Sequence, residues 1–346
     1  MDWSQLPHDL LYFISKKLPD LSDFIRFRAV CKRWHSAAPV SDPPRQLPWI
    51  VAARYGRPST VRFYSLSTGK YYSFIFNEVE GKQLLGSSHG YMLAFDPNSR
   101  LLSLLNPLTR KEIHLPPTDS DWHRPVRPLY IGPDPVQSGD DVVICWSSSD
   151  DDVLTVGLCR PGDQEWKKIQ ISGGVNGQTY YNGMYFVNES KTLATKVIDT
   201  KTGTTLSTIP PLICTTTGNP RGLYYLIMSS GELLGVYGGK WTCQFIGDYE
   251  FEVYRLDSEN KVPQWIRIDS IGDRVLFLDD TVGFCLSTTD LKGFKGDCIY
   301  FIASLYDMDG FSDYPLCMYD MKNRIAQAAE PGPYGDMSSW FFPCIS

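Results

Sequence analysis

Residues 89–117 read HGYMLAFDPNSRLLSLLNPLTRKEIHLPP, and residues 182–211 read NGMYFVNESKTLATKVIDTKTGTTLSTIPP. The two stretches share few residues, but each begins with a Gly-aromatic strand, passes through polar turns and closes on paired prolines. Gly90 and Gly183 are 93 residues apart, which leaves room for two units of about 46 residues. A period of about 40–50 residues with about four short strands is typical of a β-propeller, because a single blade cannot bury both faces alone.

The rest of the chain beyond residue 48 follows the same pattern. Short runs rich in β-branched and aromatic residues, such as VVICW at 142–146, alternate with Gly, Pro, Asn and Asp, which is typical of strands and turns. Counting a first unit at 49–80, we expect about six blades. The interval 231–297 is longer than one unit and leaves open an insertion or a partial blade. A β-sandwich or two stacked barrels would also contain many short strands, but neither predicts this period.

The N-terminal segment, residues 1–38, is helical in pattern. Leu10, Phe13 and Ile14 have the spacing of one helical face. Pro19 is expected to end this first helix, and a second helical stretch follows Asp20 and fades at residue 38. So small a segment rarely forms a self-sufficient core, so part of its apolar surface is expected to pack elsewhere.

Residues 39–48, PVSDPPRQLP, contain four prolines in ten positions. Each proline lacks an amide donor and restricts its neighbour, so we expect a stiff, extended linker. The sequence therefore predicts a helical domain at 1–38, a linker at 39–48 and a β-propeller at 49–346. The helices could pack on the propeller, but such a linker disfavours this by holding the two apart, and an external helical partner is favoured.

Composition excludes several classes of protein. The net charge of −6 and pI near 5.4 give no general attraction to nucleic acid or anionic lipid. We expect no signal peptide and, without a run of about 18 apolar residues, no membrane span. Nine scattered cysteines, mostly within apolar runs, are expected to be reduced in a cytoplasmic or nuclear protein.

The sequence contains no catalytic or phosphate-binding motif and no metal-ligand spacing, so no cofactor is predicted. His89 and the acidic pairs or runs, including Asp279-Asp280, are interpreted as structural or solvated turn residues. An enzyme site in a central channel stays an alternative, since scattered propeller residues can converge there. The segment WHRPVRP, 122–128, is expected to form an exposed loop. Its Trp122, Arg124 and Arg127 are candidates for contacting a partner.

The N-terminal segment resembles an F-box, because many positions agree in order over about 35 residues. These positions are Leu6-Pro7, Asp9-Leu10-Leu11, Ile14, Leu18-Pro19, Asp23-Phe24, Arg26, Arg28, Val30-Cys31 and Trp34. The remainder resembles the KIB-type, kelch-like propeller of plant F-box proteins. That likeness rests on residues 101–117, 253–278, 293–303 and 339–343. Kelch repeats proper carry a Gly-Gly pair in each blade, whereas this chain has Gly173-Gly174 and Gly238-Gly239, so it resembles a divergent member.

The resemblance implies a substrate-recognition subunit of an SCF-type ubiquitin ligase. Its F-box would dock on a Skp-family adaptor bound to a cullin, and its propeller would capture an unidentified protein for ubiquitylation. It would be a non-catalytic subunit that contributes proximity and orientation. A ligase-independent scaffold and a propeller enzyme remain the alternatives. The positions carried over as adaptor-facing or F-box core are Leu6, Pro7, Leu10, Ile14, Leu18, Val30, Cys31 and Trp34.

Overall fold

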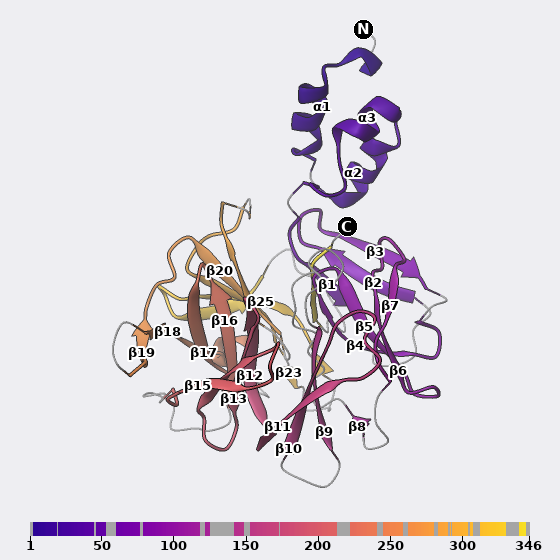
Figure 1. The fold of residues 1–346 in the computed structure, drawn as a ribbon. Helices are drawn as coiled ribbons and strands as arrows, with labels where there is room; N and C mark the ends of the chain where they lie inside the picture. Colours follow the sequence, from indigo (N-terminus) through magenta and orange to yellow (C-terminus); the bar gives the residue numbers. More distant parts are fainter. Residues whose placement is uncertain are drawn as a thin grey trace.

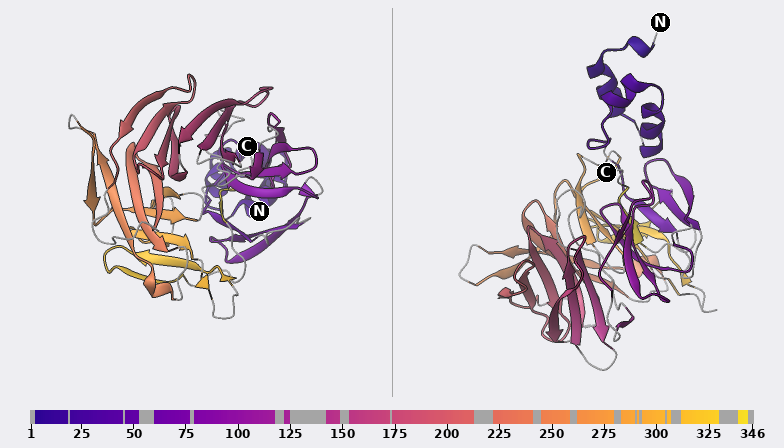
Figure 2. Two further views of the ribbon diagram at one scale, coloured as in Figure 1. Left: turned by 90° about the horizontal axis from the view of Figure 1, so that it is seen from below. Right: turned by 45° about the vertical axis from the view of Figure 1, so that its right-hand side comes forward.

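A small helical unit stands on one face of a ring of β-sheets, over the first sheet of the ring (Figures 1 and 2). This computed structural model describes residues 3–18, 20–44, 46–52, 60–76, 79–117, 122–124, 142–148, 153–172, 174–212, 222–240, 245–258, 262–279, 283–289, 291, 293–303, 305–306, 312–329 and 339–343.

The helical unit comprises the 3-10 turn η1 (Trp3–Gln5) and the helices α1 (His8–Ser15), α2 (Leu21–Arg28) and α3 (Lys32–Ala37). The prediction of one continuous second helix was wrong, because residues 29–31 separate α2 from α3. Cys31 is extended, with φ −164° and ψ 169°, and it precedes the first residue of α3. This break explains why Val30 faces solvent, whereas a continuous helix would place it on the same side as Phe27, three residues earlier.

Within the described residues, five sheets have four strands and a sixth has five, in agreement with the prediction of about six blades. We number these blades in chain order. In the left view of Figure 2, which looks down the axis of the ring, the blades lie side by side around a common centre. The first blade contains β1 (Trp49–Ala52), β2 (Thr60–Ser65), β3 (Lys70–Ile75) and β27 (Ser339–Phe341), and the second contains β4 (Gln83–Ser88), β5 (Tyr91–Asp96), β6 (Leu101–Leu105) and β7 (Glu112–His114).

Three further blades follow the same antiparallel plan. The third contains β8 (Trp122–Arg124), β9 (Val142–Ser148), β10 (Val153–Cys159) and β11 (Lys167–Ser172). The fourth contains β12 (Val175–Tyr181), β13 (Met184–Glu189), β14 (Thr195–Asp199) and β15 (Thr205–Ile209). The fifth contains β16 (Gly222–Ser229), β17 (Glu232–Lys240), β18 (Phe251–Asp257) and β19 (Gln264–Ile268), with the turn η3 (Ile246–Asp248) between β17 and β18.

A recurrent two-residue turn explains the repeat that the sequence displays. In the second, fourth and fifth blades, the first two strands are joined by a residue with positive φ followed by a glycine with positive φ. A type I′ turn requires positive φ at both of these positions. The pairs are His89-Gly90, Asn182-Gly183 and Ser230-Gly231. The two stretches that revealed the period therefore begin at this turn and hold the last three strands of the second and fourth blades.

The sixth blade departs from the plan and accounts for the long interval 231–297. Its order is β21-β20-β22-β25-β26, and β20 pairs with β22 in parallel. A hairpin strand has thus been added beside β20. The strands are β20 (Arg274–Leu278), β21 (Gly283–Ser287), β22 (Cys298–Ile302), β25 (Leu316–Asp320) and β26 (Ile325–Ala328). In the chain segment that connects β22 to β25, β23 (Leu305–Tyr306) and β24 (Ser312–Asp313) form a short antiparallel pair of their own.

Segments far apart in sequence meet in the first blade. Its strand β27 pairs antiparallel with β1, so Trp340 lies opposite Ile50. Trp340 is 2% exposed, its indole Nε1 donates to the Leu278 carbonyl at 2.9 Å, and its backbone N–H donates to Asp279 Oδ2 at 3.0 Å. The interpretation of Asp279 as a solvated turn residue was therefore wrong: its buried carboxylate fastens the first blade to the sixth.

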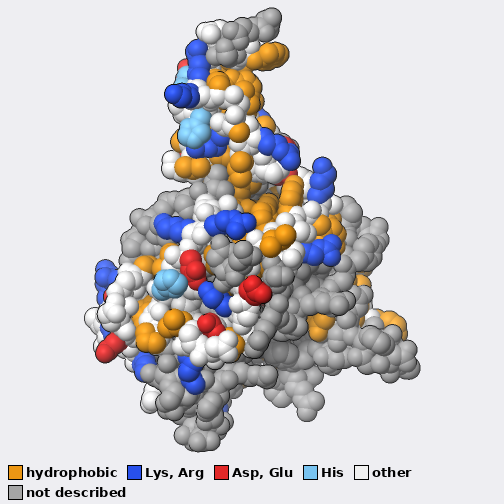
Figure 3. All heavy atoms as spheres, turned by 90° about the vertical axis from the view of Figure 1, so that its right-hand side faces the viewer, with side chains coloured by type: hydrophobic (Ala, Val, Ile, Leu, Met, Phe, Trp, Pro, Cys, Tyr) orange, Lys and Arg blue, Asp and Glu red, His pale blue; other side chains and the backbone are white. Residues whose placement is uncertain are grey.

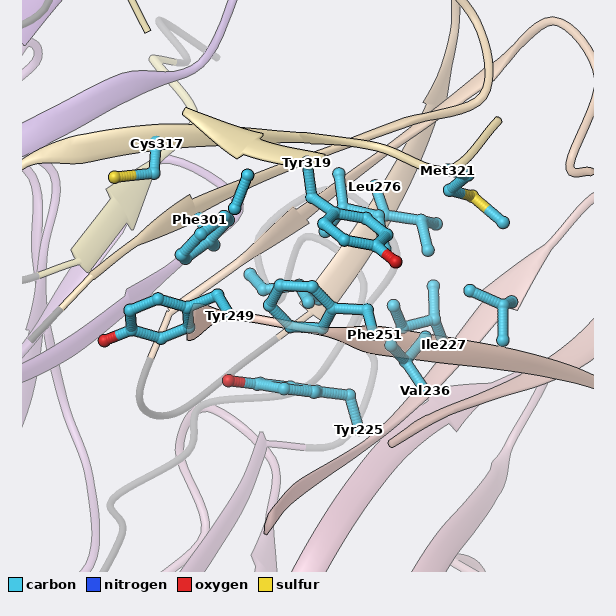
Figure 4. Close-up of a cluster of buried hydrophobic side chains, with 14 of the residues drawn as sticks. Tyr225, Ile227, Val236, Tyr249, Phe251, Leu276, Phe301, Cys317, Tyr319 and Met321 are labelled. Carbon is cyan, nitrogen blue, oxygen red and sulfur yellow. The ribbon is translucent and has the colours of Figure 1, made fainter. Parts of the chain in front are cut away.

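Apolar side chains fill the space between neighbouring blades. Between the fifth and sixth blades, Tyr225, Val236 and Phe251 face Phe301 and Tyr319 (Figure 4). Phe251 meets the rings of Phe301 and Tyr319 edge-on, with centroids 5.0 and 5.4 Å apart. Such contacts explain why strands such as β5 and β20 are buried along most of their length, since a sheet between two neighbours is covered on both faces.

No disulfide joins the five cysteines whose side chains the structure describes. Cys159, Cys298 and Cys317 are buried, and Cys31 and Cys285 are half-buried. In the described part of the chain, no helix has the length and apolar character needed to cross a membrane.

Candidate docking face

The helical unit buries one side of each of its main helices in a common core. Asp20 precedes helix α2 as its N-cap, and its Oδ1 accepts the backbone N–H of Asp23 at 2.9 Å. From α1 the core takes Leu11, which is fully buried. Its buried apolar members are Leu11, Leu21, Phe24, Phe27, Ala37 and Ala38.

The opposite side of α1 leaves an apolar stripe in solvent. Leu10, Phe13 and Ile14 are 50%, 59% and 37% exposed, and their spacing of three and four residues places them on one side of the helix. We call these three residues the docking face. Lys17, one turn beyond, holds its ammonium group 5.1 Å from the centre of the Phe13 ring, so a positive charge borders the apolar surface.

Other exposed apolar side chains of the unit include Trp3, Ile25 and Val30. Hydrophobic side chains interspersed with Lys and Arg reach the surface of the helical unit in Figure 3. Large apolar side chains that remain exposed together in a soluble unit indicate an interaction surface.

The residues predicted from the F-box pattern divide into two groups. Pro7, Leu10, Ile14 and Val30 are exposed, whereas Leu6, Leu18 and Trp34 pack against the core. The Trp34 ring lies 4.4 Å from that of Phe27, and its Nε1 donates to the Trp3 carbonyl at 3.3 Å. Cys31 is half-buried beside α3. Phe13, Trp3 and Ile25 were not in the predicted set, although the helical spacing of Phe13 with Leu10 could have included it.

The second predicted site lies partly outside the described residues. Trp122–Arg124 form strand β8, which pairs with β9, and not the exposed loop that the sequence predicted. The side chains of Trp122 and Arg124, and Arg127 as a whole, lie outside what the structure describes.

A catalytic alternative would need a cavity with convergent titratable groups. Among the described residues, a pocket of about 20 Å³ lies beside β18, β19 and β25, which is room for about one water molecule. Its buried Glu252 is paired with Arg267 at 3.0 Å and accepts the Tyr254 hydroxyl at 2.8 Å. His89 is an exposed residue of the I′ turn between β4 and β5. Neither place brings unsatisfied reactive groups together.

The chain thus combines an N-terminal helical unit, which carries an apolar docking face, with a ring of blades. This architecture is that of a propeller protein with an N-terminal helical domain. The chain belongs to the KIB1-4 beta-propeller family, whose model matches residues 63–322, and an F-box-like model matches residues 3–42. It is therefore a plant-type F-box protein with a propeller domain.

Individual relatives agree with this assignment. The F-box protein At2g17036 of Arabidopsis thaliana is 26% identical over 84% of this chain and 80% of its own length. The F-box protein At2g05970 of the same plant is 24% identical over 99% of this chain and 97% of its own. A solved structure of a nidogen/laminin complex aligns with 86% of this chain at a TM-score of 0.43 and 9% identity, too distant to add to the assignment.

Proposed function

We propose that this protein is the substrate-recognition subunit of an SCF-type ubiquitin ligase. The F-box docks on a Skp-family adaptor and through it on a cullin, and the propeller binds the protein to be ubiquitylated. F-box proteins are generally adaptor subunits of ubiquitin ligases, so the bond-making chemistry belongs to other subunits. Cytoplasmic or nuclear residence, where thiols stay reduced, is part of the proposal.

The docking face carries this proposal. Leu10, Phe13 and Ile14 lie within the segment that matches the F-box-like model, and they are exposed although neighbouring Leu11 is fully buried. An exposed apolar stripe on a helix is suited to packing against a groove or helix of a partner. For the propeller, Trp122, Arg124 and Arg127 stay candidate substrate contacts.

Co-purification with a Skp-family adaptor tests the docking step. Replacing Leu10 by Asp places a charge in the centre of the docking face, so we expect at least about tenfold weaker adaptor binding, as for an interface hot spot. The matched control is Leu101→Asp, an equivalent change at a 43% exposed leucine of β6 in the propeller. Circular dichroism would verify that both variants fold.

Adaptor capture by the fragment 39–346, which lacks the helices, is the result that would contradict the proposal. If it captured the adaptor as well as the full chain does, the docking proposal would be wrong. A ligase-independent scaffold would use the same helices for another partner, so the purified complex should also be probed for cullin. Its absence from an otherwise intact adaptor complex would favour the scaffold.

A further inference from the structure

The F-box touches the propeller directly, contrary to the expectation that the prolines hold the two apart. The first contact joins α2 to the first blade, which lie next to each other in Figure 1. The Tyr72 hydroxyl of β3 donates to Asp20 Oδ2 at 2.6 Å. Asp20 is only 3% exposed, and the Tyr72 ring stacks on that of Trp49, with centroids 5.1 Å apart. Both ends of the Tyr72 side chain are therefore held.

A second contact comes from the second blade. Asn106, fully buried between β6 and β7, accepts the backbone N–H groups of Leu108 and Thr109 on its Oδ1 at 2.9 and 3.1 Å. This turn holds Leu108 where it packs against both the F-box core and the apolar cluster shared by the first two blades.

The third contact involves the linker itself. Asp42 accepts the Tyr12 hydroxyl at 2.5 Å and pairs with the ammonium group of Lys16, which also donates to the Pro43 carbonyl at 2.9 Å. The linker thus folds back on α1, the helix that carries the docking face. The prediction of an extended spacer was wrong, because the acidic Asp42 among the prolines meets a basic and a phenolic partner on α1.

We propose that Tyr72, Leu108 and Asp42 are positioning residues that hold the F-box in one orientation on the propeller. The proposal rests on the proposed function, because a fixed orientation matters if the adaptor binds one part and a substrate the other. The Asp20–Tyr72 hydrogen bond and the Leu108 contact join the F-box to two different blades. The contacts of Lys16 with Asp42 and Pro43 hold the start of the linker against α1, which shortens the free connection to β1. Together these contacts restrain rotation of the F-box about any one of them. A protein bound to the propeller would then be presented at one place relative to the ligase.

The distance between the two parts tests this in the full chain. Spin labels would be placed through unnatural amino acids at exposed Lys32 of α3 and exposed Lys201 after β14, since nine native cysteines preclude thiol labelling. We expect one narrow distance distribution in the parent. Tyr72→Phe combined with Leu108→Ala should at least double its width. Tyr71→Phe is the matched control, because its ring packs within the blade against Tyr64 and Arg62.

A broad distribution in the parent, or an unchanged width in the double variant, would overturn the proposal. Tyr72→Phe alone, which removes one oxygen, keeps the test meaningful if Leu108→Ala impairs folding. These distances are measured without the adaptor, so failure of adaptor binding would refute the proposed function and leave the positioning result standing. In a reconstituted ligase, self-ubiquitylation should spread from few lysines in the parent to more lysines in the double variant, and an identical lysine pattern would count against the proposal.

Discussion

The Asp20 carboxylate serves two structures at once. Its Oδ1 caps α2 and accepts the Ser22 hydroxyl at 2.7 Å, and its Oδ2 binds Tyr72 of the propeller. Burial by itself raises the pKa of Asp20, but the hydrogen bonds from Tyr72, Ser22 and Asp23 outweigh it and bring the pKa below its ordinary value. The charged form is therefore favoured in the folded protein.

This pKa shift predicts how the contact depends on pH. A carboxylate whose folded pKa is lowered adds stability above its unfolded pKa, near 4, and that stability is lost as pH falls through the folded value. Tyr72→Phe should lower the free energy of unfolding by about 1.5–3 kcal/mol at pH 7, and the difference from the parent should shrink below about pH 4. Urea unfolding between pH 7 and pH 3 measures it.

The control for this titration is Tyr71→Phe, whose effect should not follow the Asp20 ionisation. A Tyr72→Phe effect that is equally large at pH 7 and pH 3 would show that the hydroxyl does not act through the charged carboxylate.

At single positions, the sequence predicted what local periodicity determines. Helical spacing placed Leu10 and Ile14 on one face of the first helix, and both are exposed. Leu108 and Tyr72 could not be predicted as F-box contacts, because they lie far along the chain from the helices and no local pattern marks them. The second helical stretch was predicted as continuous because its apolar spacing carries on to Val30, beyond the end of α2 at Arg28.

Among the elements, β17 contains Gly238-Gly239, one of the two glycine pairs noted in the sequence. Gly238 has φ +148°, and a Cβ atom there would lie 2.2 Å from the Glu250 carbonyl oxygen and 2.7 Å from the Phe251 Cα. Both atoms belong to backbone, which cannot rotate away as a side chain could. The glycine therefore permits the close approach of β17 to the start of β18. On its opposite edge, β17 pairs with β16, and the register of that pairing shifts at the same level.

We expect Gly238→Ala to destabilise the propeller by about 1–3 kcal/mol, the range of a strained backbone position. Gly247→Ala, in the nearby turn η3, is the matched control, because no atom lies within 4 Å of its new methyl group. Thermal unfolding of both variants gives the comparison. Equal melting temperatures would mean that β17 and β18 separate at little cost.

Strand positions followed from the sequence better than strand partners did. The run SWFFP was expected to be a strand, and β27 forms there, but nothing local shows that it pairs with β1. The hairpin added to the sixth blade was expected only as an irregularity in the period, because apolar runs such as residues 275–278 do not specify parallel or antiparallel neighbours.

At the scale of the whole molecule, the F-box core includes a side chain of the propeller. Leu108 packs against that core, and Tyr72 satisfies the Asp20 carboxylate. We therefore expect the fragment 1–48 to lose most of its helical signal in circular dichroism, since so short a chain buries too little apolar surface. Adding a Skp-family adaptor should restore helicity if it covers the docking face. A fragment as helical alone as within the full chain would show that the propeller contributes nothing to F-box folding.

The pairing of β27 with β1 also means that the first blade cannot be completed until nearly the whole propeller has been synthesised. About 290 residues separate Trp49 from Ser339, so a ribosome adding about 5–20 residues per second needs about 15–60 s between the two strands. During that time β1 has a free edge on the side that β27 later occupies, and Tyr72 belongs to a blade still lacking a strand. The F-box is synthesised before the blades that it contacts, and the unpaired edge of β1 is open to pairing with another chain until β27 arrives.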